Sequence, residues 1–132
     1  MTTAIICSAI LAAMLFLLGF NVSRMRGVTA KAGGSQMPTD PASPLLLAIR
    51  AHGNAAEYVP TLIVLILVCA TLSGGWWVQA LAMAAVVARY LHAFGMLTSK
   101  TLASHGPVRD IGALGTYVTG VALGITAIVA VA

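Results

Sequence analysis

Four long apolar segments, separated by shorter polar ones, dominate the order of residues along the chain. They run from Ala4 to Val22, from Leu45 to Leu72, from Trp76 to Leu97 and from Ile111 to Ala132. The hydrocarbon core of a bilayer is roughly 30 Å thick, and about 20 residues of helix cross it. The pattern therefore predicts an all-α integral membrane protein. We expect a single up-and-down four-helix bundle that occupies residues 1–132.

Composition strengthens this prediction. Of the 132 residues, 60% are hydrophobic and 8% are charged, whereas about 25% of the residues in a soluble domain are charged. No basic residue precedes the first apolar run, and Arg24 and Arg26 follow it. A cleaved signal peptide has the opposite charge order. The first segment is therefore predicted to be a retained membrane span.

The three connections differ in charge, and this difference predicts the topology. Basic residues flank the first and third connections, and none lies in the second, Ser73 to Gly75. The flanking residues are Arg24, Arg26, Lys31, Arg50, Lys100 and Arg109. Cytoplasmic loops carry an excess of lysine and arginine. We expect the first and third connections to be cytoplasmic and both termini to lie outside.

Glycine, proline and alanine predict where the helices end and where they meet. The first connection, Ser23 to Pro44, is rich in glycine and proline and is predicted to be flexible, with Pro44 opening the second helix. The third connection runs from Thr98 to Val108. Small residues at four-residue steps in the last two segments predict close helix contacts. These are Ala80, Ala84, Ala88, Gly120 and Gly124.

The sequence gives no sign of nucleic-acid or metal binding. The net charge of +4 is compatible with nucleic-acid binding. No basic stripe with interleaved aromatic residues is present, however, so no nucleic-acid partner is expected. No metal-binding spacing of cysteine or histidine occurs either. Cys7 and Cys69 lie in apolar surroundings and are most simply small buried hydrophobes, while a disulfide between them stays open.

Polar residues interrupt the start of the second segment. Arg50, Asn54 and Glu57 have the spacing i, i+4, i+7, so they share one face of a helix, with Tyr58 beside them. An ionisable group within a membrane span indicates a functional site by default, because it is costly there unless it is paired. This face is therefore expected to be shielded from lipid.

Arginines of the third and fourth segments are predicted to join this face. Arg89 and His92 lie on one side of the third helix, and counting from Leu97 places Arg89 at about the depth of Glu57. Arg109 opens the fourth helix at the same border. Because arginines outnumber carboxylates, we expect a pocket open to the cytosol in which a ligand supplies negative charge.

Structural interpretations of the same residues stay open. One alternative is that Arg89 and Glu57 form a buried ion pair whose role is purely structural. Arg24, Arg50 and Lys100 are candidate anchors whose charged ends reach the membrane surface. His92 is alternatively a packed polar residue, and Tyr117 either faces the pocket or simply packs.

The sequence resembles the membrane-associated proteins in eicosanoid and glutathione metabolism, a family that includes microsomal glutathione transferases and the leukotriene and prostaglandin E synthases. The resemblance covers nearly the whole chain. Its most specific part is Arg50-x-x-x-Asn54-x-x-Glu57-Tyr58-x-Pro60, which is similar to the family's second-helix signature. Ala88-Arg89-Tyr90-Leu91-His92 is similar to its third-helix motif. Where eicosanoid-making members have a tyrosine, this chain has Met96.

The resemblance implies a homotrimer that binds glutathione between adjacent protomers near the cytosolic face. Arg109 is the nearest counterpart of the family's catalytic arginine, which stabilises the glutathione thiolate. Arg24 or Arg26 corresponds to the arginine at the end of the first helix. The residues that match the family's glutathione contacts are Arg50, Asn54, Glu57, Tyr58 and His92. Arg89 is also expected to bind glutathione.

The resulting hypothesis is a glutathione-dependent membrane transferase or peroxidase that acts on lipophilic electrophiles entering from the lipid. The expected partners are glutathione as co-substrate, a lipophilic small molecule, membrane lipid and two further copies of the chain. The expected location is a bacterial inner membrane. Two alternatives remain: a non-catalytic protein that binds glutathione or another anion, and a small proton-coupled exporter that uses Glu57 as its coupling carboxylate.

Overall fold

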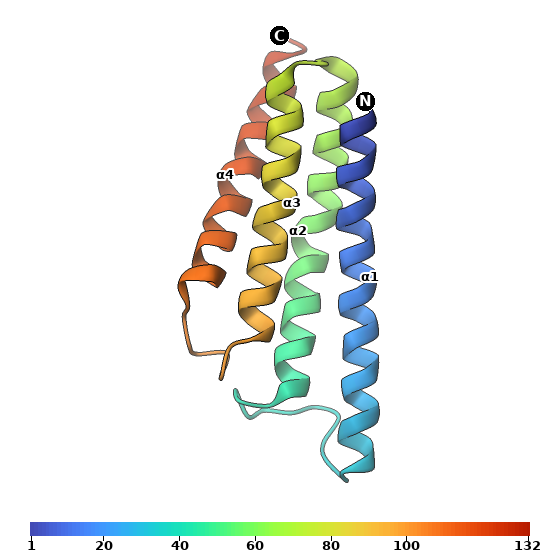
Figure 1. Cartoon of the computed structure of the whole chain (residues 1–132), viewed down its shortest axis with the longest axis vertical. Helices are drawn as coiled ribbons and strands as arrows, with labels where there is room; N and C mark the ends of the chain where they lie inside the picture. The colour runs from blue at the N-terminus through green and yellow to red at the C-terminus, as the bar shows by residue number, and fades with distance from the viewer.

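The computed structural model describes all 132 residues as an antiparallel bundle of four α-helices (Figure 1). The helices are α1 (Thr2–Lys31), α2 (Pro44–Leu72), α3 (Trp76–Leu97) and α4 (Pro107–Val129). Both termini lie at one end, and the first and third connections lie at the other. All four helices are long and apolar enough to cross a membrane. The predicted fold is therefore confirmed for the single chain.

Local sequence signals explain where two of the helices begin. The Ser43 hydroxyl accepts a hydrogen bond from the Leu46 N–H at 3.4 Å, and Pro44 follows as the first residue of α2. Serine is a favoured N-cap, and proline suits the first turn because its missing N–H has no helical partner there. Pro107 opens α4 in the same way after Gly106. The predicted role of Pro44 is confirmed.

The end of α1 differs from the prediction. The helix continues past Val22 to Lys31, so the expectation of a loop beginning at Ser23 is wrong for residues 23–31. These residues include three cations but no proline, and a helix that leaves the membrane needs no continuous apolar face. The chain turns at Gly33, whose φ of +69° favours glycine. The fourth helix likewise begins at Pro107, before the predicted Ile111, and ends at Val129.

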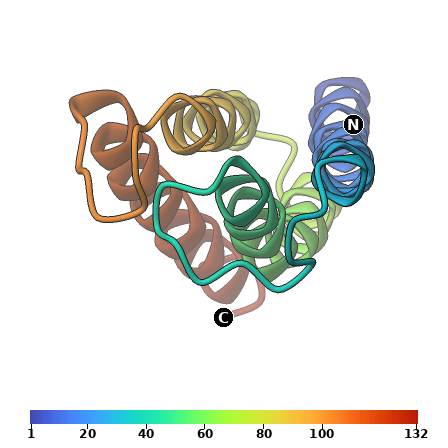
Figure 2. The same ribbon diagram turned by 90° about the horizontal axis from the view of Figure 1, so that it is seen from below.

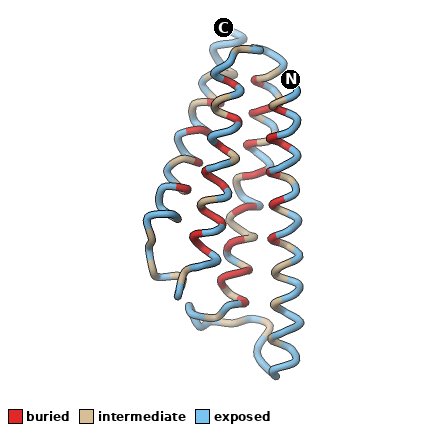
Figure 3. Tube along the Cα trace, viewed as in Figure 1, coloured by how far each residue is buried: buried red, intermediate tan, exposed pale blue.

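The helices form an open arrangement, not a closed square (Figure 2). α2 lies between α1 and α4, which make no contact with each other, while α3 touches the other three helices. The buried residues recur along all four helices (Figure 3). Large apolar side chains point outward as well, and Phe16 is 78% exposed. This distribution suits a bundle whose outer surface faces lipid.

Close packing of α3 on α4 depends on three glycines. A Cβ on Gly112 would lie 2.4 Å from the His92 backbone nitrogen, and one on Gly95 would lie 2.6 Å from that of Arg109. Gly115 faces the Cβ of Ala88. The prediction of close contacts is confirmed for Ala88, which faces both Gly112 and Gly115. The predicted glycines of α4 do not make such contacts, because Gly120 has only ordinary contact distance to Leu62 and Gly124 has no neighbour within 4 Å.

The two cysteines are free and buried. Cys69 contacts the Leu123 carbonyl oxygen of α4, with its sulfur 3.2 Å away. They do not form a disulfide, so the interpretation of small buried hydrophobes is confirmed.

Candidate site around a buried arginine

Arg89 lies at the point where α2, α3 and α4 meet and is 1% exposed. Its Nη2 donates to the Asn54 side-chain oxygen at 2.8 Å, and its Nη1 donates to the Thr116 hydroxyl at 3.5 Å. The guanidinium carbon is 5.4 Å from the ring centroid of Tyr58, a cation–π distance. The contact with Asn54 confirms that Arg89 reaches the depth of the second-helix motif.

No carboxylate of the chain neutralises Arg89. The one ion pair in the structure joins His105 and Asp110, at 3.3 Å, and Glu57 is exposed. The buried Nε of Arg89 also has no hydrogen-bond partner. Arg89 and Glu57 therefore make no direct ion pair within this chain. Taking a charge out of water costs several kcal/mol unless another charge compensates it. The groups that contact Arg89 are the neutral side chains of Asn54, Thr116 and Tyr58. They offset only part of this cost.

The polar side chains of α2 divide between its surface and its interior. Arg50 and Glu57 are exposed, whereas Asn54 and Tyr58 are partly buried and contact Arg89 of α3. The predicted common face is thus split between the two environments. The expected shielding of this face from lipid is not achieved within one chain. Counting from Pro44, Glu57 lies about 20 Å along the axis of α2, which places it well inside this membrane-spanning helix.

A groove between α2 and α4 begins beside the buried arginine. The rings of Tyr58 and Tyr117 are 5.8 Å apart and tilted by 55°, so Tyr117 faces this groove. Its volume is about 270 Å³. It is lined by Tyr58, Thr61, Leu62, Leu65, Thr116, Tyr117, Gly120 and Val121. Because Tyr58 and Thr116 also contact Arg89, one wall of an otherwise apolar groove borders a cation.

Thr116 and Thr61 were not among the predicted site residues. Thr116 touches Arg89 and also donates to the Gly112 carbonyl oxygen at 2.8 Å. One signal for it was available, because Thr116 follows Arg109 at helical spacing i, i+7. Threonine hydroxyls bonded back to their own helix are common, however, and the sequence alone does not separate this one from the others.

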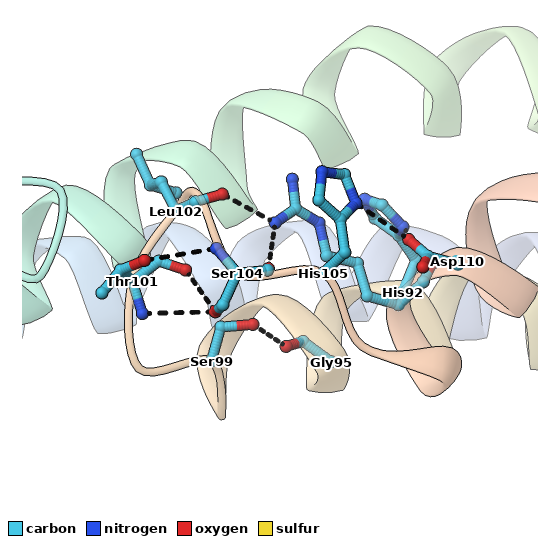
Figure 4. Close-up of polar contacts among 9 residues, drawn as sticks. His92, Gly95, Ser99, Thr101, Leu102, Ser104, His105 and Asp110 are labelled. Atoms are coloured by element: carbon cyan, nitrogen blue, oxygen red, sulfur yellow. Dashed lines mark hydrogen bonds and ion pairs between the residues drawn. The ribbon is translucent and has the colours of Figure 1, made fainter.

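Arg109 is held by the third connection (Figure 4). Its Nη1 donates to the carbonyl oxygens of Leu102 and Ser104, at 3.1 and 3.3 Å. His92 is buried, and its Nδ1 lies 3.0 Å from the Arg109 carbonyl oxygen. A carbonyl oxygen only accepts, so His92 Nδ1 carries the proton in this contact. His92 therefore joins α3 to the start of α4.

Arg24 lies apart from the buried arginine. Its Nε and Nη2 donate to the Asn21 side-chain oxygen at 3.3 and 3.0 Å. Tyr90, next to Arg89 in sequence, contacts Ile10 of α1, and Arg24 is about 21 Å further along that helix. Arg26 is exposed.

Within one chain, the predicted site residues therefore do not meet in a single pocket. The structure gathers Arg89, Asn54 and Tyr58 and adds Thr116 and Tyr117. Four predicted residues lie outside this cluster. Arg24 lies too far along α1, and the side chains of Arg50, Glu57 and Arg109 point elsewhere.

Comparison with known families identifies one match. A model of the MAPEG family matches residues 4–129, a range that includes every predicted site residue. A comparison with curated proteins finds no match.

Proposed function

Because the chain belongs to the MAPEG family, which includes glutathione transferases and related enzymes, we propose that it is a glutathione-dependent membrane enzyme. It conjugates glutathione to lipophilic electrophiles or uses glutathione to reduce lipophilic peroxides. We place its termini outside and its first and third connections in the cytoplasm of a bacterial inner membrane.

The observation that carries this proposal is the exposed polar surface of α2 that bears Arg50 and Glu57, on the same helix whose Asn54 contacts the buried Arg89. We call this surface the α2 strip. Arg50 and Glu57 lie on the surface of a membrane-spanning helix. An ionised group that faces lipid is expensive, so a neighbouring protomer and a polar ligand are needed to cover the strip. This requirement supports a homotrimer with its site between protomers.

Glutathione has charges complementary to this strip. It carries two carboxylates and one ammonium group. Arginine's planar fork binds carboxylates well, so Arg50 is suited to one carboxylate, while Glu57 is suited to the ammonium. Arg89 has no acidic partner in the chain, and its field favours the negative charge of the bound peptide from behind α2.

The reaction needs the thiolate form of glutathione. A free thiol has a pKa of about 8.5, and a nearby guanidinium lowers it, the role proposed for Arg109. In conjugation, the sulfur forms a bond to the electrophilic carbon and the leaving group departs with its electron pair. In peroxide reduction, the sulfur takes one oxygen to give a sulfenic acid and an alcohol, and a second glutathione then forms the disulfide and water.

Calorimetric titration of the detergent-solubilised chain with glutathione tests the binding site. Arg50→Ala and Glu57→Gln are each expected to weaken binding by roughly tenfold or more, since hydrogen bonds to charged groups contribute about 1.5–3 kcal/mol. Lys31→Ala, which removes an exposed cation at the end of α1, is the matched control and is expected to leave binding unchanged. Equal affinities for all four proteins would eliminate the α2 strip as the site.

One observation favours a second function, non-catalytic binding of glutathione. One nitrogen of the Arg109 guanidinium, Nη1, already donates to two carbonyl oxygens of the third connection, which orients the side chain and leaves fewer of its donors for a thiolate. If the chain is an enzyme, the wild-type protein with bound glutathione is expected to show the ultraviolet absorbance of the thiolate, and this absorbance is expected to fall in Arg109→Ala. Binding without a thiolate band or turnover of any electrophile would establish the non-catalytic function instead.

A further inference from the structure

An open cavity of about 500 Å³ lies at the loop end of the bundle, bordered by α1, the start of α2, the end of α3 and residues of the first and third connections. We call it the border cavity. It is lined by Asn21, Arg24, Met25, Ala42, Pro44, Leu47, Leu97, Ser99 and Lys100. Two of these residues are cations and none is acidic. The cavity is separate from the groove beside Arg89, with which it shares no residue.

The cations of the border cavity have unused hydrogen-bond donors. Arg24 is oriented by Asn21 through Nε and Nη2, which leaves Nη1 without a partner. The Lys100 ammonium forms neither a hydrogen bond nor an ion pair in the chain. Asp40, close to the cavity in sequence, accepts a hydrogen bond from the Ala42 N–H at 2.9 Å and caps its own turn. The cavity thus presents positive charge.

A backbone hydrogen bond fixes the connections that border this cavity. The Leu102 N–H donates to the Pro41 carbonyl oxygen at 2.9 Å and joins the first connection to the third. Ser99 is held by a hydrogen bond from its hydroxyl to the Gly95 carbonyl oxygen at 2.7 Å. The wall that carries Lys100 is therefore tied both to α3 and to the loop before α2.

A separate apolar groove lies further along α1 and α3 from the border cavity. It has a volume of about 540 Å³ and is lined by Ile10, Val86, Val87, Tyr90, Leu91 and Phe94. Phe94 lies one helical turn from Leu97 of the border cavity, and Val86 lies about 16 Å from Leu97 along the axis. The Tyr90 hydroxyl donates to the Ile10 carbonyl oxygen at 3.3 Å and bridges the two helices.

We propose that these two features together form a binding site for an anionic phospholipid of the leaflet on the loop side. The phosphate lies between Arg24 and Lys100, and one acyl chain lies in the groove between α1 and α3. Basic pockets between membrane helices on the cytoplasmic side suit anionic headgroups. The rise of about 16 Å from Leu97 in the border cavity to Val86 at the far end of the groove matches one leaflet, half of a hydrocarbon core of roughly 30 Å. The site shares no residue with Arg50 and Glu57 of α2, where glutathione is proposed to bind.

The headgroup half is tested with the full chain in detergent, by native mass spectrometry with two lipids of equal chain length. Dioctanoyl phosphatidylglycerol is expected to bind more tightly than dioctanoyl phosphatidylcholine. Lys100→Gln is expected to weaken phosphatidylglycerol binding about fivefold, equivalent to about 1 kcal/mol for one basic residue. Lys31→Gln, which removes an exposed cation outside the cavity, is expected to change nothing. Because Lys100 is exposed, its replacement does not endanger folding.

The acyl-chain half is tested by filling the groove. Val87→Trp is expected to weaken phosphatidylglycerol binding at least fivefold. Val118→Trp is the matched control, because Val118 is equally exposed on α4 (58% against 57%) and lies outside the groove. The proposal is overturned if Lys100→Gln affects both lipids equally, as expected of a simple topology anchor, or if Val87→Trp has no effect. It is also overturned if inorganic phosphate or glutathione displaces the lipid completely at comparable concentration.

Discussion

Replacing Gly112 with alanine is expected to lower the stability of the bundle by about 1–3 kcal/mol, the usual cost of overpacking a filled interior. The added Cβ would lie 2.4 Å from the His92 nitrogen, 2.7 Å from the His92 Cα and 2.8 Å from the Ala88 carbonyl oxygen. All three are backbone atoms, so no side-chain rotation relieves the overlap. α3 and α4 have to separate, which displaces Arg89 and His92 from their partners on α4. Thermal unfolding followed by circular dichroism in detergent measures the change.

Gly124→Ala is the matched control for this experiment. Gly124 lies in the same helix and has no neighbour within 4 Å. Alanine is a better helix former than glycine by about 0.5–1 kcal/mol, so this variant is expected to unfold at the same or a higher temperature. If both variants unfold alike, the close approach of α3 and α4 at Gly112 is wrong.

Replacing Arg89 with methionine is expected to separate stability from ligand binding. The guanidinium is buried without an acidic partner. Substituting apolar side chains of similar volume for buried charges is often neutral or stabilising, so the bundle should remain at least as stable. Glutathione binding should weaken by roughly tenfold, because a charge about 10 Å away contributes on the order of 1–2 kcal/mol at an effective dielectric of 20. Thermal unfolding and calorimetric titration of one preparation measure both quantities.

Arg89→Lys is the informative companion variant. It retains the charge but loses the planar fork that reaches Asn54 and Thr116 together. Its affinity for glutathione should therefore lie between those of the wild type and Arg89→Met. Wild-type affinity in Arg89→Met would mean that the buried cation does not attract the ligand. Unfolding of Arg89→Met at a much lower temperature would instead assign Arg89 a structural role.

Much of the fold follows from local patterns of the sequence. A run of about 20 apolar residues requires a membrane helix because lipid offers no other partner for the backbone. Proline at a first turn marks a helix start, which is why the beginning of α2 at Pro44 was predictable. The end of α1 was not, because a helix that leaves the membrane loses its apolar signal, although its backbone hydrogen bonds continue to Lys31.

The candidate site was likewise predictable only in part. Spacing along α2 and counting from the end of α3 were sufficient to place Arg89 at the depth of the Asn54–Glu57 motif, because rise per residue is constant in a helix. They did not identify its partner. Asn54 and Glu57 are three residues apart, so their side chains differ by about 60° around the helix axis. That angle turns Asn54 toward α3 and leaves Glu57 exposed.

Helix identity, antiparallel order and the depth of each polar residue were thus readable from the linear order of side chains, since each depends on the constant geometry of one helix. The uncompensated charge of Arg89, the glycines that join α3 to α4 and the separation of the border cavity from the Tyr58 groove were decided by the tertiary structure. These features depend on how far each helix is rotated about its axis. That rotation is set by contacts between helices and has no signature in any one of them.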